Sequence, residues 1–227
     1  MIGVFDSGRG GLSALAELKR LAPSADLCFF ADTKNAPYGT KSKNELIEIV
    51  KNDINILRES GADVILMACC TASTVHRYLP EDMKKIAVPI IAPTAKRASK
   101  LTRVGRVGVI ATEATVASRA FTLALSAYPS VKEVRELATQ RLVTLVEGGV
   151  DDTAVTQESR REIEDILAPL REWDIDTLIL GCTHFPHLEK EIKRYLPSVV
   201  TVSSAREGAM EVLKITSRQG SGRTVYI

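Results

Sequence analysis

Two cysteines that lie far apart in the chain have similar surroundings and are the residues best suited to chemistry. Cys69 closes the apolar segment 62–69, Cys182 closes the apolar segment 176–182, and small polar residues follow each of them at once. Short apolar runs bounded by turn residues are typical of the central strands of a parallel sheet. We therefore expect both cysteines at the carboxyl ends of strands, where open α/β sheets bind their ligands.

The residues that follow the two cysteines favour the start of a helix. Thr71, Ser73 and Thr74 follow the first cysteine, and Pro186 follows the second. The amino terminus of a helix presents free N–H groups and a partial positive charge, so it holds carboxylates and lowers the pKa of a nearby thiol. The pattern predicts two activated thiols beside two anion-holding turns.

Composition and charge narrow the class of protein. The chain has 227 residues, 30 basic and 28 acidic, and these are well mixed, so neither nucleic acid nor an anionic membrane is indicated as a partner. Its longest apolar runs, such as 64–70, are far too short to span a bilayer. The first residues lack the basic region and long apolar segment of a signal peptide. We therefore expect a cytoplasmic protein whose four cysteines are free thiols.

Strand and helix patterns alternate along the chain. Apolar runs predict strands at 2–5, 26–31, 63–69, 86–91, 106–111, 131–137, 176–182, 199–202 and 223–227. Periodic apolar residues predict helices at 12–21, 42–61, 94–101, 115–127, 153–173, 188–196 and 205–215. Pro169 is expected to kink the 153–173 helix or to end it early. This alternation indicates an α/β fold with mostly parallel sheets.

The two cysteine strands lie roughly half the chain apart, and strand-turn-helix units surround each of them. We expect two similar α/β lobes, each a mostly parallel sheet flanked by helices, with the active site between them. Residues 1–92 and about 205–227 would form the first lobe, and residues 93–204 the second, with the division near Pro93.

Short motifs occur in a fixed order along nearly the whole chain. They are Gly-Val-Phe-Asp-Ser-Gly-Arg-Gly-Gly-Leu-Ser at 3–13, Ala-Asp-Thr at 31–33, Pro-Tyr-Gly at 37–39, Gly-Ala-Asp at 61–63, Ala-Cys-Cys-Thr-Ala-Ser at 68–73, Ile-Ala-Thr at 110–112, Ala-Thr-Val at 114–116, Leu-Val-Glu at 145–147 and Gly-Cys-Thr-His-Phe-Pro at 181–186. In this combination the chain resembles the glutamate racemases of the aspartate/glutamate racemase superfamily. The resemblance implies an interconversion of L-glutamate and D-glutamate that uses no cofactor and no metal, and that supplies D-glutamate for bacterial peptidoglycan.

The resemblance also implies roles for individual residues. Inverting Cα without a cofactor needs a base on one face of the carbon and an acid on the other, and two thiols can supply both. By resemblance, Cys69 removes the proton from D-glutamate and Cys182 removes it from L-glutamate, while Asp6 and His184 assist the two thiols. The positions that match substrate-holding residues of the family are Asp6, Ser7, Tyr38, Gly39, Cys70, Thr71, Thr115, Thr183 and His184, and Glu147 is a weaker match.

Several positions depart from the family pattern. Cys70 stands where the family has an asparagine expected to hydrogen-bond the substrate, and a thiol is a much poorer donor than an amide. The final strand is expected to be unpaired or completed by another subunit, because the chain stops at Ile227 before a turn and helix that many members have. A homodimer is one arrangement that this allows. The other departures are Arg9, Ala92 and the pair Ser203-Ser204.

Other interpretations stay open at this point. Cys70 leaves room for a racemase of aspartate or another amino acid, although aspartate racemases usually have glutamate at the position of His184. A catalytically weak paralogue that binds an acidic amino acid or a protein partner is the alternative from another class. Zinc ligation by the cysteines and His184 lacks the usual ligand spacing, and a dinucleotide loop lacks its third small residue at Ser13.

Some of the same residues also suit purely structural roles. Cys28 lies midway along a predicted strand and fits a core position. The polar candidates fit turns, helix caps or the solvated surface equally well on local rules; they are Asp6, Ser7, Tyr38, Thr71, Thr115, Glu147, Thr183 and His184.

Overall fold

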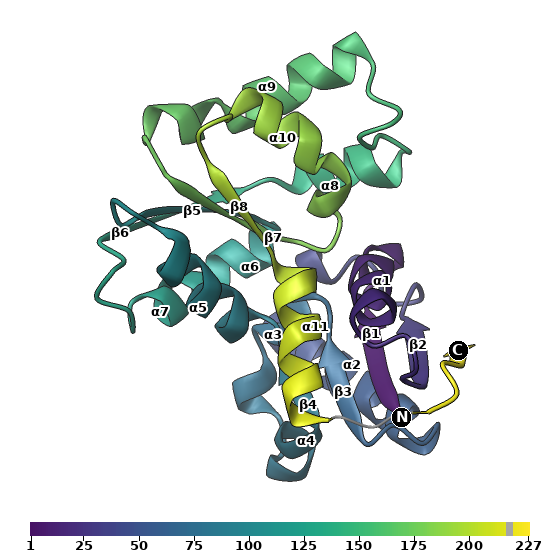
Figure 1. Ribbon diagram of the computed structural model, residues 1–227. Helices are drawn as coiled ribbons and strands as arrows, with labels where there is room; N and C mark the ends of the chain where they lie inside the picture. The colour runs from purple at the N-terminus through teal and green to yellow at the C-terminus, as the bar shows by residue number, and fades with distance from the viewer. Residues whose placement is uncertain (217–219) are drawn as a thin grey trace.

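The computed structural model describes residues 1–216 and 220–227, and it consists of two lobes, each built on a parallel sheet (Figure 1). The first sheet has the strand order β4-β3-β1-β2-β9, and the second has the order β6-β5-β7-β8. All of the strand pairings in both sheets are parallel. The predicted α/β fold with two mostly parallel sheets is confirmed.

The strands fall close to the apolar runs that predicted them. The first sheet contains β1 (Ile2–Asp6), β2 (Leu27–Ala31), β3 (Val64–Met67), β4 (Ala87–Pro89) and β9 (Thr224–Tyr226). The second contains β5 (Arg106–Ala111), β6 (Glu133–Ala138), β7 (Thr177–Gly181) and β8 (Val200–Ser203). Every residue of β1, β3 and β7 is buried, which is why these strands read as continuous apolar runs.

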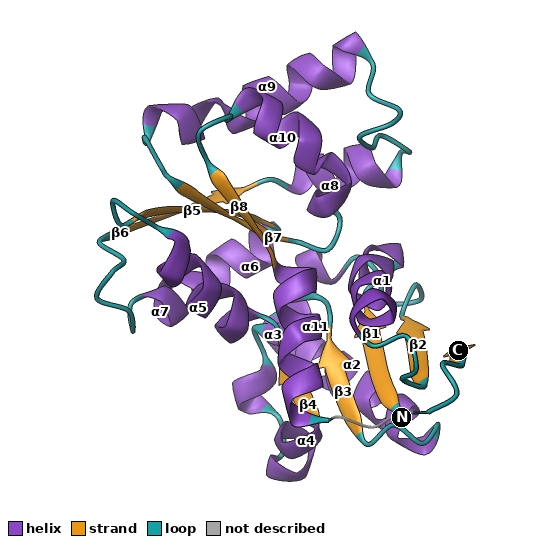
Figure 2. Ribbon diagram, viewed as in Figure 1, coloured by secondary structure: helices purple, strands orange, loops and turns teal. Residues whose placement is uncertain are grey.

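Helices flank both sheets (Figure 2). Those of the N-terminal part are α1 (Leu12–Leu21), α2 (Lys43–Glu59), α3 (Cys70–Ser73), α4 (Glu81–Ile86) and α5 (Ile91–Leu101). Those that follow are α6 (Glu113–Ser118), α7 (Ala120–Leu125), α8 (Gln140–Glu147), α9 (Gln157–Glu172), α10 (Glu189–Tyr195) and α11 (Ser204–Ile215). Short 3-10 helices complete the chain at η1 (Arg9–Gly11), η2 (Tyr38–Thr40), η3 (His76–Tyr78) and η4 (Phe185–Leu188). No helix in the described part of the chain is long and apolar enough to cross a membrane.

One core of buried apolar side chains is continuous across both lobes. It joins residues of β1 and α1 to residues of β5, α5, α7 and α11. The helix α11 follows β8 of the second sheet and packs against α1 and β3 of the first lobe (Figure 1). Separate clusters fill the space under α2 in the first lobe and under α9 and α10 in the second. The shared core ties the two sheets together and so fixes how the site residues of one lobe face those of the other.

Local sequence signals explain several helix boundaries. Ser42 caps α2 by accepting a hydrogen bond from the backbone N–H of Glu45, and the Glu45 carboxylate accepts one from the backbone N–H of Ser42. The segment 113–125 is two helices rather than one, because Arg119 adopts a left-handed conformation with φ of 53°. Residues 91–93 already belong to α5, so this helix begins three residues earlier than predicted.

Two expectations from the sequence are wrong. Pro169 does not end the long helix early, since α9 continues through it to Glu172. The buried face of α9, formed by Ile163, Leu167 and Leu170, packs into the second lobe and outweighs the lost backbone hydrogen bond. The last strand is not unpaired, because β9 pairs in parallel with β2.

The carboxylate of Asp26 holds the segment before β9 in place. It accepts hydrogen bonds from the backbone N–H groups of Ser221 and Arg223 at 2.9 and 3.0 Å. A lobe boundary near residue 92 and another near residue 204 stay predictions.

Candidate active site

A small cavity lies where the carboxyl ends of the central strands of both sheets meet. Its volume is about 30 Å³, and it is lined by Ser7, Ala36, Pro37, Tyr38, Gly39, Cys69, Cys70, Thr71, Thr112, Gln140, Val143, Glu147, Gly181, Cys182, Thr183 and His184. A space of this size holds a water molecule or two and no amino acid, so the surrounding walls must separate for a larger ligand to enter.

A wider chamber adjoins the cavity on the side of η1 and α8. Its volume is about 570 Å³, and four of its lining residues also line the cavity: Ser7, Ala36, Glu147 and His184. These four residues therefore stand between the cavity and the larger space, which makes the chamber the evident route to the thiols.

Cys69 reaches the cavity from the first lobe. It follows the end of β3 and occupies the position before α3, where the backbone N–H groups of Ala72 and Ser7 face its sulfur. Its Sγ lies 3.8 Å from the hydroxyl of Ser7. These donors are placed to stabilise a thiolate.

Cys182 reaches the same cavity from the second lobe, directly after β7. Its Sγ lies 3.4 Å from Nδ1 of His184. The Nε2 atom of that ring lies 3.5 Å from a carboxylate oxygen of Glu147. The imidazole thus connects the buried sulfur to a carboxylate whose side chain is 59% exposed.

Burial sets the protonation of both sulfurs. It raises the pKa of Cys69 to about 12, and the nearby charge of Asp6 raises it further. Burial likewise raises the pKa of Cys182 well above its ordinary value. The expectation that helix starts would lower both thiol pKa values is therefore wrong for the closed cavity, because the loss of water outweighs the N–H groups.

The sulfurs also influence each other. A negative charge on Cys69 raises the pKa of Cys182, which places the two sulfurs near enough to interact. When one thiol loses its proton, the other therefore holds its proton more tightly. The site favours at most one thiolate, and that is the state in which one sulfur can act as base while the other acts as acid.

Asp6 lies behind the cavity wall at the end of β1 and is fully buried. Its carboxylate accepts hydrogen bonds of 3.0 Å from the backbone N–H of Gly8 and from the hydroxyl of Thr183, which belongs to the second lobe. Burial raises the pKa of Asp6 to about 6 despite these donors. The charge of the Asp6 carboxylate acts on Cys69, and its hydrogen bond with Thr183 joins the two lobes.

His184 is held neutral. The residue is 8% exposed, and burial lowers the pKa of its imidazole to about 4. A neutral ring has one nitrogen free to accept a proton, and Nδ1 is the nitrogen beside the Cys182 sulfur. His184 is therefore placed to accept a hydrogen bond from the Cys182 thiol, and its low pKa leaves the proton on the sulfur in the closed cavity.

Residues 14–212 match the Asp/Glu/Hydantoin racemase family. The chain belongs to this racemase family. A glutamate racemase from Desulforudis audaxviator is 44% identical over 206 residues, which cover 90% of this chain and 74% of that protein. The resemblance to glutamate racemases is confirmed.

Solved structures agree with this membership. A glutamate racemase from Bacillus anthracis superposes with a TM-score of 0.89 at 33% identity, over 100% of this chain and 86% of that chain. A glutamate racemase from Francisella tularensis, solved in complex with D-glutamate, superposes with a TM-score of 0.87 at 26% identity, over 99% of this chain and 86% of that chain. The two-lobed architecture is that of the racemase family.

Tyr38 and Gly39 form part of the cavity wall of this racemase through η2. The Tyr38 hydroxyl lies 2.7 Å from a carboxylate oxygen of Asp32 and 2.5 Å from one of Asp53. Burial raises the pKa of Asp53 to about 7. One phenol proton cannot serve two carboxylates, so a protonated Asp53 satisfies the pair. The network anchors the turn that carries Gly39.

Three buried threonines form the wall beside Cys70. The hydroxyl of Thr71 lies 2.9 Å from that of Thr112 and 3.1 Å from that of Thr115. Thr71 and Thr112 line the cavity, whereas Thr115 does not and lies behind them. The expected helix cap is Thr112 and not Thr115, because the Thr112 side chain accepts the hydrogen bond from the backbone N–H of Thr115.

Cys70 lines the cavity but interacts away from it. Its Sγ lies 3.4 Å from the hydroxyl of Ser204, which in turn donates to the backbone carbonyl of Leu180 at 2.8 Å. Burial raises its pKa well above the ordinary value of a thiol. This thiol is therefore a weak partner for any polar ligand in the cavity.

The structure brings most of the predicted residues together. The cavity is lined by Ser7, Tyr38, Gly39, Cys69, Cys70, Thr71, Glu147, Cys182, Thr183 and His184, whereas Asp6 and Thr115 stand behind its wall. Cys28 is a buried core residue of β2, as expected. In the part of the chain that the structure describes, no cluster of three His, Cys, Asp or Glu side chains is arranged to hold a metal ion.

Two polar wall residues were missed by the sequence analysis. Thr112 follows β5 and Gln140 follows β6 by one residue more, so both occupy the same end of the second sheet as Cys182. The rule that ligands bind at the carboxyl ends of parallel strands would have found both.

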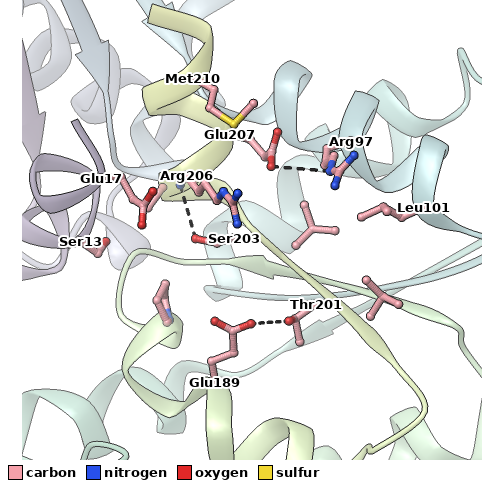
Figure 3. Close-up of a pocket in the computed structure, with 14 residues that line it drawn as sticks. Ser13, Glu17, Arg97, Leu101, Glu189, Thr201, Ser203, Arg206, Glu207 and Met210 are labelled. Carbon is pink, nitrogen blue, oxygen red and sulfur yellow. Dashed lines mark hydrogen bonds and ion pairs between the residues drawn. The ribbon is translucent and has the colours of Figure 1, made fainter. Parts of the chain in front are cut away.

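A separate groove of about 480 Å³ lies between α1, α5, β8 and α11 (Figure 3). Figure 3 shows the ion pair between Arg97 and Glu207, whose nearest atoms are 3.9 Å apart. The Ser13 hydroxyl lines this groove and donates to the backbone carbonyl of Gly10 at 2.8 Å; the carbonyl of Thr183, across the lobe boundary, lies 3.2 Å from it.

At Gly10 the two lobes approach each other closely. A Cβ atom at Gly10 would overlap Oγ1 of Thr183 and would lie 3.0 Å from two atoms of the His184 ring. Only a residue without a side chain allows the turn after β1 to meet the turn after β7 so closely.

Proposed function

We propose that the protein interconverts L-glutamate and D-glutamate by proton transfer between two thiols, without a cofactor. The observation that carries this proposal is that Cys69 and Cys182, from opposite lobes, line one cavity. Membership of the racemase family and 44% identity to a glutamate racemase support glutamate as the substrate. The complex of the Francisella tularensis glutamate racemase with D-glutamate supports the same substrate.

The proposed reaction moves one proton at a time. With L-glutamate bound, the Cys182 thiolate removes the Cα proton, and the electron pair left on Cα is shared with the adjacent carboxylate. The Cys69 thiol then gives its proton to the opposite face of Cα, which yields D-glutamate. Cys182 ends as a thiol and Cys69 as a thiolate, so the same steps run in reverse for D-glutamate.

Asp6 and His184 are the groups placed to accept the thiol protons when the walls separate for the substrate, whereas in the closed cavity both thiols keep their protons. His184 Nδ1 takes the proton of Cys182, from which it is 3.4 Å away. The Asp6 carboxylate has a pKa of about 6, and its charge acts on Cys69, so we assign it as the proton acceptor on that side. Neither thiol would ionise unaided at neutral pH, because burial raises both thiol pKa values.

The remaining wall residues hold the substrate. The hydroxyls of Ser7 and Thr71 and the backbone around Gly39 suit the two carboxylates of glutamate, since all can donate hydrogen bonds. The Thr183 hydroxyl donates its proton to Asp6, so it would have to leave that carboxylate to bind one of the substrate. In the cell the product would be D-glutamate for peptidoglycan, made in the cytoplasm. A homodimer stays a prediction.

Circular dichroism with L-glutamate, D-glutamate and both aspartate enantiomers tests the proposal. We expect either glutamate enantiomer to lose its signal as the racemate forms, and deuterium from heavy water to enter Cα. The Cys70→Asn variant, assayed in parallel, measures how far the thiol at this position limits glutamate binding. If aspartate racemises and glutamate does not, the substrate is aspartate and the assignment of glutamate is wrong. The absence of Cα exchange into any of these amino acids would refute the activity.

A further inference from the structure

Gln140 is a polar residue of the cavity that has no role in the proposed mechanism. It is the first residue of α8 in the second lobe, and only Thr139 separates it from the end of β6. Its side chain lines the cavity together with both catalytic cysteines. Its amide oxygen Oε1 is buried and has no hydrogen-bond partner among the residues that the structure describes.

The amide oxygen of Gln140 lies close to Gly39, which belongs to the facing wall of the cavity. A Cβ atom built on Gly39 would lie 3.2 Å from Gln140 Oε1 and 3.2 Å from Cβ of Thr112. The amide therefore reaches from the second lobe to the turn of the first lobe that Tyr38 anchors. A buried amide oxygen without a donor destabilises the closed cavity, so a donor group on the ligand would remove that penalty.

The chain lacks an amide at the position where the family resemblance leads us to expect one. Cys70 stands there instead, and its sulfur contacts the hydroxyl of Ser204 rather than a donor in the cavity. Cys70 and Gln140 line the same small space from opposite lobes. The amide chemistry missing from one wall is thus present on the facing wall.

The chemistry of the ligand decides which of its groups can meet Oε1. At neutral pH a glutamate molecule carries two carboxylates, which only accept hydrogen bonds, and one α-ammonium group, which only donates. Since Oε1 only accepts, the α-ammonium group is its complement.

We propose that Gln140 binds the α-ammonium group of the substrate through Oε1 and so supplies the amide contact that Cys70 cannot. This inference rests on the proposed function, because it takes glutamate as the ligand. Gln140 positions Cα between the two sulfurs and takes no part in the proton transfers.

The test compares Gln140→Met, which removes the amide at nearly constant length, with Gln140→Glu, which keeps an oxygen acceptor. Gln157→Met is the matched control, because Gln157 also opens a helix but is exposed and lies outside the cavity. Isothermal titration calorimetry with D-glutamate and with glutarate gives the binding constants. Glutarate is the right comparison because it has both carboxylates and no ammonium group.

We expect Gln140→Met to weaken D-glutamate binding by about 10-fold to 100-fold, the range for a hydrogen bond to a charged group, and to leave glutarate binding within about twofold. Gln157→Met should keep both affinities. Gln140→Glu should keep D-glutamate binding and weaken glutarate binding, because its carboxylate attracts the ammonium group and repels the two carboxylates. Adding Cys70→Asn to Gln140→Met should recover about tenfold in D-glutamate affinity, since it returns an amide to the cavity. KM for glutamate should follow the binding constants while kcat changes less.

Equal losses for D-glutamate and glutarate, or unchanged D-glutamate binding in Gln140→Met, would overturn this assignment. Failure of the proposed function looks different. In that case the unmodified protein binds D-glutamate by calorimetry with the dependence on Gln140 intact, yet gives no racemisation. If racemisation proceeds and Gln140→Met binds normally, the function stands and the role of Gln140 falls.

Discussion

The two halves of the cavity hold the same chemical group, a buried thiol, in different electrostatic surroundings. On the first lobe, Cys69 sits among backbone N–H groups near Asp6, a carboxylate that is completely buried. On the second lobe, Cys182 sits beside His184, whose outer nitrogen faces the exposed Glu147. One thiol is therefore supported by an enclosed anionic base and the other by a neutral base with a link to the surface.

Burial acts in opposite directions on the two supporting groups. It raises the pKa of Asp6 to about 6 and lowers the pKa of His184 to about 4, because in each case the charged form is disfavoured. Near neutral pH Asp6 is therefore mostly ionised, whereas His184 is neutral. In the proposed mechanism a near-symmetric reaction therefore proceeds between two half-sites whose supporting groups differ in chemistry.

The largest effect is expected from removing either thiol. Cys69→Ser and Cys182→Ser should each lower kcat for racemisation by about 10²-fold to 10⁴-fold, since a hydroxyl is a far weaker acid and base than a thiol. Circular dichroism of glutamate solutions measures the loss. Cys28→Ala is the matched control, because Cys28 lies in β2 away from the cavity and should leave turnover unchanged. Full activity in either serine variant would contradict the proposal that both thiols transfer protons.

The pH dependence of stability should separate Asp6 from His184. Between about pH 4 and pH 6 native Asp6 keeps a proton that the unfolded chain has released, so its contribution to stability falls as the pH rises. Between about pH 4 and pH 6.5 the unfolded chain keeps a proton that native His184 lacks, so that contribution rises with pH. The two slopes oppose each other, and each amounts to about 3 kcal/mol in full.

Urea unfolding of Asp6→Asn and His184→Asn across this range checks the signs. The free energy of unfolding of Asp6→Asn should rise more steeply with pH than that of the unmodified protein, and Asp6→Asn should be the more stable of the two at pH 8. The free energy of unfolding of His184→Asn should rise less steeply with pH than that of the unmodified protein. Parallel curves for the three proteins would mean that neither group is perturbed as described.

The same two variants should differ in which proton transfer becomes slow. Enantiomers have equal free energies, so kcat/KM must fall by the same factor in both directions, by about 10²-fold for the loss of a proton-transfer group. The asymmetry should instead appear in the kinetic isotope effects. With Cα-deuterated substrates, His184→Asn should show its larger isotope effect with L-glutamate, and Asp6→Asn should show it with D-glutamate. Identical isotope effects for both enantiomers would contradict the assignment of one supporting group to each thiol.

The smallest effect is expected at Glu147. Its contact with the neutral ring of His184 is 3.5 Å long and its side chain is 59% exposed, so the contact is worth about 0–1 kcal/mol. Glu147→Gln should lower kcat by less than about fivefold, and raising the salt concentration should shrink the difference further. Steady-state rates at low and high salt measure it. A loss as large as that of His184→Asn would show that Glu147 belongs to the proton-transfer machinery.

Much of this architecture could be predicted from the sequence because the central strands are buried on both faces. That burial demands continuous apolar runs, and the runs at 2–6, 64–67 and 177–181 are visible without a structure. The site followed from the topology, since polar residues directly after such strands converge at one end of each sheet. Pro169 was misjudged because local propensity cannot weigh the packing of the helix face against one lost hydrogen bond.

The rest depends on the meeting of the two lobes. The sign of the thiol pKa shifts could not be derived from helix starts, because it is set by how completely both lobes exclude water. The unpartnered oxygen of Gln140 is likewise a property of the assembled cavity and of no local pattern. The placement of Thr115 behind Thr71 arises from contact between residues 44 positions apart.

The absence of a side chain at position 10 has a consequence for catalytic competence. Thr183 and the His184 ring rest directly on that backbone, so Gly10 sets the clearance between the halves of the molecule. A methyl group at this position would push the turn after β7 away from the turn after β1. The distance over which a proton must move between a sulfur and Cα would then increase. Proton transfer tolerates little extra distance, so a turn that contributes no functional group still governs whether the paired thiols can work together.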